Sequence, residues 1–142
     1  MPIKLNGGLN YALCEPDSWF AIEEFNGNYL ISLPSSGLYL HAWGGDFNGA
    51  PIKLNGDRNY AANEVTSQFA IEQLQVTGKH LISIISNGLY FHAYGGNSRG
   101  MPIALHMDRD YAVAQPDSQF LLEPVVGPHW SDAHGKSCMQ KV

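Results

Sequence analysis

An internal repeat constrains the fold of this chain more than any other feature of its sequence. Residues 28–75 align without a gap with residues 79–126, at a constant separation of 51 positions, and residues 2–23 match the second half of the same unit. Three residue types recur at equivalent places: Pro2, Pro51 and Pro102; Tyr11, Tyr60 and Tyr111; Phe20, Phe69 and Phe120. The chain therefore holds about two and a half copies of one structural unit.

Each full copy contains four short segments with the composition of β-strands. In the middle copy they are Tyr29–Leu33, Leu38–Trp43, Pro51–Leu54 and Gln68–Gln73. Clusters of Gly, Asn, Asp and Ser separate them, and no segment shows a convincing helical period, so we expect an all-β fold. Four strands in each of three repeats are typical of the β-trefoil, a closed barrel with a hairpin cap and pseudo-threefold symmetry. A propeller blade has a similar length, but two and a half blades cannot close a ring.

The predicted β-trefoil domain covers residues 1–125, with a half repeat at 1–27 and full repeats at 28–78 and 79–125. Residues 126–142 form a C-terminal tail. The first repeat is incomplete because it lacks the equivalents of the first two strands. Either the tail closes the barrel, or another chain does, or the sequence is a shortened natural form. An opening would expose strand edges and apolar side chains, so we expect a homodimer.

Apolar residues of the strand segments form the predicted core. In the middle copy they are Leu38, Leu40, Ile52, Leu54, Phe69 and Ile71, and in the last copy they are Leu89, Phe91, Ile103, Leu105, Phe120 and Leu122. The first copy contributes Ile3, Leu5, Phe20 and Ile22.

Charge and composition disfavour several classes of partner. The net charge is −5 with only 8 Lys and Arg residues, so we expect neither nucleic acid nor acidic membrane surfaces as partners. No stretch approaches the ~18 apolar residues of a membrane span, and the N-terminus lacks a signal-peptide pattern. We expect a protein that is cytoplasmic or exported by an unconventional route. In that setting, we expect Cys14 and Cys138 to be two free thiols.

A set of polar residues and glycines recurs together with the core positions. Residues 41–45 read HAWGG and residues 92–96 read HAYGG. The candidate site of the middle copy consists of His41, Gly44, Gly45, Asn55, Asp57 and Asn59. The candidate site of the last copy consists of His92, Gly95, Gly96, His106, Asp108 and Asp110. The first copy offers only Asn6, Gly8 and Asn10, so we expect two working sites.

The chemistry of these residues suits a sugar. Carboxylates, amides and neutral imidazoles form directional hydrogen bonds with the hydroxyl groups of a hexose. Glycine lets a backbone N–H approach a ligand closely, and Trp43 or Tyr94 can stack on the apolar face of a sugar ring. Because the whole set recurs at one spacing, we predict carbohydrate binding without a cofactor.

Simpler structural roles are also open for these residues. Glycine pairs are typical of turns with positive φ. Asp57 and Asp108 can belong to Asx turns, and Trp43 and Tyr94 can serve packing alone.

Metal binding and catalysis are less favoured. A zinc site formed by His92, His106 and Asp108 is disfavoured because the residues equivalent to His106 are Asn6 and Asn55. No nucleophile motif or phosphate-binding loop is present. A glutamate recurs in all three copies, at Glu23, Glu72 and Glu123. Its repetition favours a structural role, and we expect no enzymatic activity.

The repeated motifs resemble those of a known family. The G-L-Y-L-H…G-x-P-I-x-L…S-Q-F pattern resembles R-type (ricin-B-like) β-trefoil lectins, which carry Gln-x-Trp where this chain has Ser67-Gln68-Phe69 and Ser118-Gln119-Phe120. The mussel mytilectins have His-Pro-Tyr/Lys-Gly-Gly and Leu-His-x-Asp-x-His, to which HAWGG, HAYGG, LNGDRN and LHMDRD are similar. Alanine replaces the proline here, and Asn55, Asn59 and Asp110 replace histidines. The resemblance covers residues 1–125 and implies binding of galactose or N-acetylgalactosamine at the candidate sites.

Glycans on glycoproteins or glycolipids are therefore the expected partners. Two alternatives remain open. The chain can be a protein-binding β-trefoil, such as an inhibitor, an actin-binding module or a lectin-like subunit of a larger complex. It can also be a lectin with another specificity, such as mannose.

Overall fold

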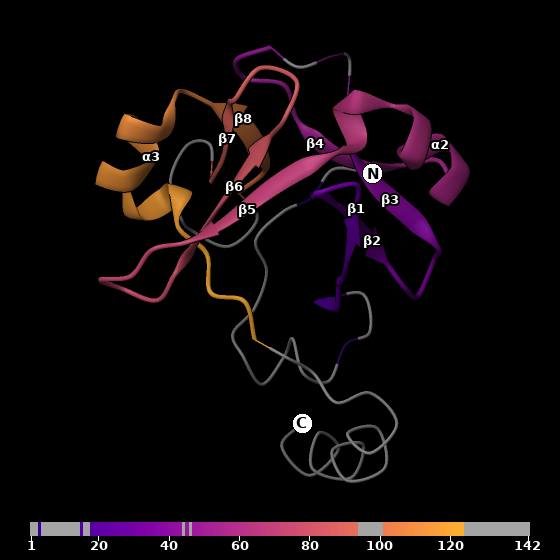
Figure 1. Ribbon diagram of the computed structural model, residues 1–142, viewed down its shortest axis with the longest axis horizontal. Coiled ribbons are helices and arrows are strands. Elements are labelled where there is room, and N and C mark those ends of the chain that lie inside the picture. Colours follow the sequence, from indigo (N-terminus) through magenta and orange to yellow (C-terminus); the bar gives the residue numbers. More distant parts are fainter. Residues whose placement is uncertain are drawn as a thin grey trace, which may run out of the picture.

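The computed structural model describes residues 3, 15, 18–43, 45, 47–93 and 101–123, and within them eight strands form one antiparallel sheet (Figure 1). The strands are β1 (Ala21–Phe25), β2 (Asn28–Leu33), β3 (Leu38–Ala42), β4 (Ile52–Asn55), β5 (Phe69–Gln73), β6 (His80–Ile84), β7 (Tyr90–Ala93) and β8 (Ile103–His106). Their order is β4-β3-β2-β5-β6-β7-β8, and β1 also pairs with β2. The strand segments predicted for the middle repeat are confirmed to within one residue at each end.

The two full repeats share one pairing pattern. β2 pairs with β1, β3 and β5, and β6 correspondingly pairs with β5, β7 and, through His80, with Phe120. The three copies also meet at the equivalent residues Ile3, Ile52 and Ile103. Ile3 donates its backbone N–H to Ile52, and Ile103 donates its N–H to Ile3, each over 2.8 Å. The sequence repeat is therefore also a repeat in space, as a pseudo-threefold fold requires.

Residues with positive φ shape the hairpins between these strands. The turn Asn26-Gly27 joins β1 to β2 with φ angles of +50° and +84°, as in the two-residue turns that match the strand twist. Gly37 and Gly88 occupy equivalent places after β2 and β6 with φ of +74° and +77°. Each donates its N–H back to the last residue of the preceding strand. Glycine is favoured at both places because an L side chain is strained there.

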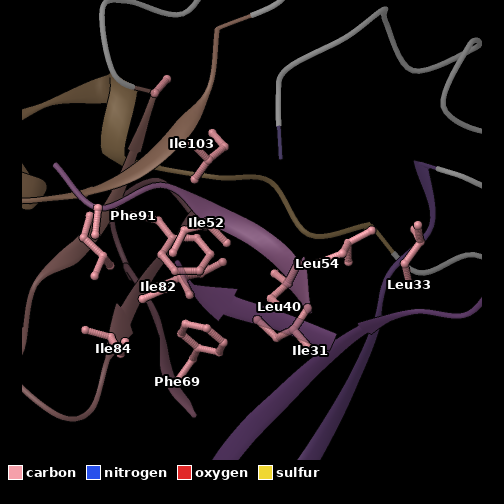
Figure 2. Packing of buried hydrophobic residues seen from close by; sticks show 14 residues of the cluster. Ile31, Leu33, Leu40, Ile52, Leu54, Phe69, Ile82, Ile84, Phe91 and Ile103 are labelled. Carbon is pink, nitrogen blue, oxygen red and sulfur yellow. The ribbon is translucent and has the colours of Figure 1, made fainter. Parts of the chain in front are cut away.

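The core is built from equivalent residues of the two full repeats (Figure 2). The buried pairs are Ile31 and Ile82, Leu33 and Ile84, Leu40 and Phe91, Ile52 and Ile103, and Leu54 and Leu105. The rings of Phe69 and Phe91 meet edge to face with their centroids 5.2 Å apart. Burying each large apolar side chain stabilises the fold by about 1.5–3 kcal/mol. Ile3, Ile71, Leu89 and Phe120 are partly buried and pack against this core.

The core prediction was wrong for four residues. Phe20, Ile22, Leu38 and Leu122 are exposed by 36–43%. Phe20 and Ile22 lie in or beside β1, which pairs only with β2 among the described strands. Leu38 opens β3 next to a turn, and Leu122 follows the single bridge at Phe120. Leu5 lies outside the described residues.

Short helices follow the fourth and eighth strands, although the sequence predicted none. They are α2 (Arg58–Asn63), η2 (Val65–Ser67), α3 (Arg109–Ala114) and η3 (Pro116–Ser118). Six residues are too few to produce a recognisable helical period. Figure 1 shows α2 and α3 on opposite sides of the molecule with the strands between them. No helix in the described ranges has the length and apolar character needed to cross a membrane.

Candidate functional site

The repeated histidines are held in place by buried serines. His41 lies on β3, and its Nδ1 is 2.8 Å from Oγ of Ser67 at the end of η2. His92 lies on β7, and its Nδ1 is 2.7 Å from Oγ of Ser118 at the end of η3. Both serines are fully buried, whereas the histidines are 8% and 7% exposed. Each imidazole is therefore oriented through Nδ1 from the inside of the protein.

The opposite edge of each ring faces the surface. Nε2 of His41 and of His92 has no hydrogen-bond partner among the described residues. In the described part of the chain, Nδ1 of His80 is the only buried side-chain nitrogen or oxygen without a hydrogen-bond partner. Nε2 of His41 and of His92 is therefore not buried. Nε2 is thus the ring nitrogen of each histidine that lies toward the surface.

Burial favours the neutral form of both imidazoles. Desolvation lowers the pKa of His41, and the nearby carboxylate of Glu64 opposes this effect. Desolvation also lowers the pKa of His92, and the positive form of His106 lowers it further, while Asp117 opposes both. A neutral ring can accept a hydrogen bond, which a protonated ring cannot.

The serine–histidine pairs do not have the geometry of a hydrolase. A catalytic serine must present its hydroxyl to a substrate, with the histidine as its base. Ser67 and Ser118 have no exposed surface, and their hydroxyls point to the inner nitrogen of the ring. These serines orient the histidines.

Aromatic rings surround each histidine. His41 meets the ring of Tyr60 on α2 edge to face, with centroids 5.5 Å apart. In the last repeat, His92 lies 5.0 Å from the ring of His106 and 5.7 Å from the ring of Tyr111. The structure therefore brings His92 and His106 together, as the sequence predicts, and adds the recurring tyrosine to the cluster.

The repeated aspartates have a structural role at the beginnings of the helices. Oδ1 of Asp57 accepts the backbone N–H of Tyr60 at 3.0 Å, and Oδ1 of Asp108 accepts that of Tyr111 at 3.1 Å. Both aspartates are N-caps. The simpler structural role that the sequence left open for both aspartates, a local hydrogen bond to the backbone, is therefore confirmed for Oδ1 of each carboxylate. The side chains remain exposed, next to the tyrosines that contact the histidines.

The remaining predicted site residues lie around these groups. Asn59 and Asp110 are exposed in the first turns of α2 and α3, and Asn55 is the last residue of β4. Gly45 has φ of +121°, and its N–H donates to the carbonyl of Ala42 at 3.2 Å, so it is a turn residue. Trp43 is 46% exposed, and the ammonium of Lys53 lies 5.1 Å from the centre of its ring.

Other predicted residues lie outside the described part of the chain. They are Asn6, Gly8, Asn10, Cys14, Gly44, Tyr94, Gly95, Gly96, Cys138 and the tail at 126–142. Within the described ranges, no group of three or more His, Cys, Asp or Glu side chains is arranged to hold a metal ion.

The recurring Ser-Gln-Phe segment has a defined structural role that sequence reasoning missed. Ser67 holds His41, and Phe69 is fully buried in the core. Between them, Nε2 of Gln68 donates to the carbonyls of Ala61 and Ala62 at the end of α2. The signal for this role was present, because Ser, Gln and Phe recur as a block at a fixed distance from the histidine.

Two recurring glutamates tie successive repeats together. Glu23 on β1 accepts a hydrogen bond from Nε of Arg58 at 2.8 Å, and Glu72 on β5 accepts one from Nε of Arg109 at 3.0 Å. Hydrogen bonding to the arginine lowers the pKa of each glutamate. The structural role predicted for these two residues is confirmed. Glu123 is exposed.

Comparisons with known proteins show the fold. No family model matches the chain, and no curated protein sequence matches it. Among solved structures, the designed threefold-symmetric protein ThreeFoil, a β-trefoil, superposes with a TM-score of 0.65 at 13% identity, covering 78% of this chain and 75% of its own. A mosquitocidal holotoxin superposes with a TM-score of 0.61 at 13% identity, covering 80% of this chain but only 13% of the toxin. The predicted all-β, β-trefoil fold is thereby confirmed, whereas mytilectin membership stays a prediction.

Proposed function

We propose that this protein is a non-enzymatic lectin that binds galactose- or N-acetylgalactosamine-type glycans through one shallow site in each full repeat. One observation carries the proposal. Both repeats place a serine-anchored imidazole, with Nε2 at the surface, beside a tyrosine whose backbone N–H is held by an aspartate.

The chemistry of these groups supports sugar binding. Neutral imidazole nitrogens accept hydrogen bonds from hydroxyl groups, and exposed carboxylate oxygens accept stronger ones. Galactose-type specificity comes from the resemblance of the two sequence motifs to mytilectins, and a β-trefoil fold is compatible with it. Each site alone would bind with a Kd of about 0.1–1 mM. Two sites on one rigid body raise the apparent affinity for clustered glycans.

A second candidate function is protein binding. Trp43 is 46% exposed and Phe47 is 55% exposed, and both belong to the loop after β3. Exposed aromatic residues on one loop are enriched at protein–protein interfaces. The two exposed aromatic residues of this loop favour a protein partner, whereas the repeated polar sites favour a glycan.

A glycan array, with galactose and mannose as soluble competitors, tests the proposal. We expect binding to galactose-terminated glycans that free galactose displaces. Displacement by mannose alone would support carbohydrate binding but overturn the proposed specificity for galactose-type sugars. A folded protein that binds no glycan would contradict the proposed function and favour a protein partner. The Trp43→Ala variant should retain glycan binding in the last repeat but lose any partner that uses the loop.

We also propose that the protein is a homodimer. Phe20 and Ile22 at β1 are 43% and 42% exposed, and Leu121 after the bridge at Phe120 is 66% exposed. Apolar side chains at strand edges favour association between chains. Analytical ultracentrifugation should show that the wild type is a dimer and that the Ile22→Lys variant is a monomer. A wild type that is monomeric at micromolar concentration would contradict this proposal.

A further inference from the structure

Residues 48–50 belong to the loop between β3 and β4 of the middle repeat. This loop is hydrogen-bonded to β8, the strand of the last repeat that ends at His106. The backbone N–H of Gly49 donates to the carbonyl of Leu105 on β8 at 2.7 Å. In return, Leu105 donates its N–H to the carbonyl of Ala50 at 2.9 Å. Asn48 directly precedes these anchored residues, so the backbone places its side chain close to the end of β8.

The side chain of Asn48 contacts the last repeat twice. Its Oδ1 lies 3.1 Å from the backbone nitrogen of Met107 and 3.1 Å from Nδ1 of His106. The N–H of Met107 can only donate, so the amide atom between them must be the oxygen. An amide oxygen can only accept, and Nδ1 of His106 must therefore carry a proton in this contact.

We infer that Asn48 is a positioning residue of the last repeat's site, and that it holds His106 as the tautomer protonated at Nδ1. This inference rests on the proposed function, because the site in question is the proposed sugar site. In the neutral ring, Nε2 is then the acceptor nitrogen. The site of the last repeat is thus assembled from two repeats.

The backbone of Met107 provides a second reason for the contact. Met107 has φ of +59°, in the region where non-glycine residues are strained, and its equivalent Gly56 has φ of +68°. The bond from its N–H to Asn48 stabilises this conformation. In the middle repeat, the side chain of Asn55 and the N–H of Gly56 have no such partner among the described residues.

The fixed ring completes a cluster that the middle repeat lacks. The ring of His106 meets Tyr111 edge to face with centroids 5.0 Å apart, and it lies 5.0 Å from the ring of His92. The middle repeat has the amide of Asn55 in place of this imidazole, and an amide both donates and accepts. We therefore expect the last repeat to bind its sugar more tightly, because its groups are positioned before the ligand arrives.

Long-range 1H–15N NMR of histidine-labelled protein tests the tautomer without any ligand. The signal of His106 is identified by its loss in the His106→Asn variant. We expect protonated Nδ1 in the wild type, a shift toward protonated Nε2 in Asn48→Ala, and the wild-type tautomer in Asn48→Asp, which keeps an acceptor oxygen. Asn87→Ala is the matched control, because it also removes a bond from an asparagine oxygen to a backbone N–H.

Galactose titration followed at the signals of His41 and His92 tests the effect on binding. Loss of one hydrogen bond predicts roughly 5–10-fold weaker binding at the last repeat in Asn48→Ala, with the middle repeat and the Asn87→Ala control unchanged. A wild type with His106 protonated at Nε2, or a changed tautomer with unchanged affinity at the last repeat, would overturn the inference. A wild type with the expected tautomer and no galactose response would instead overturn the proposed function and, with it, the role of Asn48 in binding.

Discussion

Single side chains in this protein serve the fold and the candidate site together. Asp57 and Asp108 begin the two α-helices through one carboxylate oxygen, in the same turns that carry Tyr60 and Tyr111. A substitution that removes the carboxylate therefore changes two properties unless the cap is preserved. Asparagine preserves it, because its side-chain oxygen caps a helix about as well as that of aspartate.

We expect the double variant Asp57→Asn Asp108→Asn to lose glycan binding while keeping its stability. The charge-assisted bonds to the sugar disappear, but both caps remain. Binding should weaken at least about tenfold, and the free energy of unfolding in urea should stay within about 0.5 kcal/mol of the wild type.

The alanine variants provide the comparison. Asp57→Ala and Asp108→Ala should each lower the free energy of unfolding by about 1 kcal/mol, because each removes a cap. Wild-type affinity for galactose in the folded asparagine double variant would show that the carboxylates serve the helices only.

At the scale of the element, the Ser-Gln-Phe segment links three parts of each repeat. In the middle repeat, its three side chains reach the histidine on β3, the end of α2 and the core. The last carbonyls of a helix lack the usual i+4 donor. Gln68 donates to two of them, that of Ala62 and that of Ala61, which also accepts the N–H of Glu64. The segment therefore fixes the helix against the strand that carries the site.

We expect Gln68→Glu to destabilise the protein by about 1–2 kcal/mol. A carboxylate cannot donate to the carbonyls of Ala61 and Ala62, and its negative charge is unfavourable at a helix C-terminus. Urea unfolding monitored by tryptophan fluorescence measures the loss. Gln75→Glu, in the exposed turn after β5, is the matched control and should change stability little. Equal stability of the two variants would mean that the helix end does not depend on Gln68.

At the scale of the whole molecule, two ion pairs join successive repeats on the surface. The Glu23–Arg58 and Glu72–Arg109 pairs each connect one repeat to the next. Both pairs are about half exposed, so solvent screens them and they are expected to specify geometry more than stability. The two buried histidines influence the stability of the whole fold through pH.

We expect stability to fall as the pH drops below about 6.5. The pKa values of His41 and His92 are lowered in the folded state, mainly by burial, so the unfolded chain takes up protons first. Above the ordinary histidine range both states are neutral and stability is constant. The lowered pKa values of Glu23 and Glu72 add a further loss only below about pH 4.5.

Urea midpoints measured from pH 8 to 5 check this expectation. The His41→Gln His92→Gln variant should show a flatter profile than the wild type, and an equal slope would contradict the assignment. Sugar binding follows the same groups. The sequence alone predicts weaker binding below about pH 6, and the lowered pKa values move this loss to lower pH.

The sequence by itself determined the repeat, the all-β class, the β-trefoil architecture and the positions of the strands. These features depend on local patterns of apolar and turn residues, which extend over a few positions and recur in each copy. The recurrence of His41 and His92 also located the candidate sites. Burial of β1 was not predictable in this way, because exposure of Phe20 and Ile22 depends on which strands pack beside them.

Only the tertiary structure decided which side chains meet. Ser67 and His41 are 26 positions apart, and Asn48 and His106 are 58 positions apart. Such contacts depend on how the repeats pack around the pseudo-threefold axis. Residues equivalent in sequence therefore acquire different partners, since the loop of one repeat lies on the strand of the next. The composite site of the last repeat is a consequence of that packing.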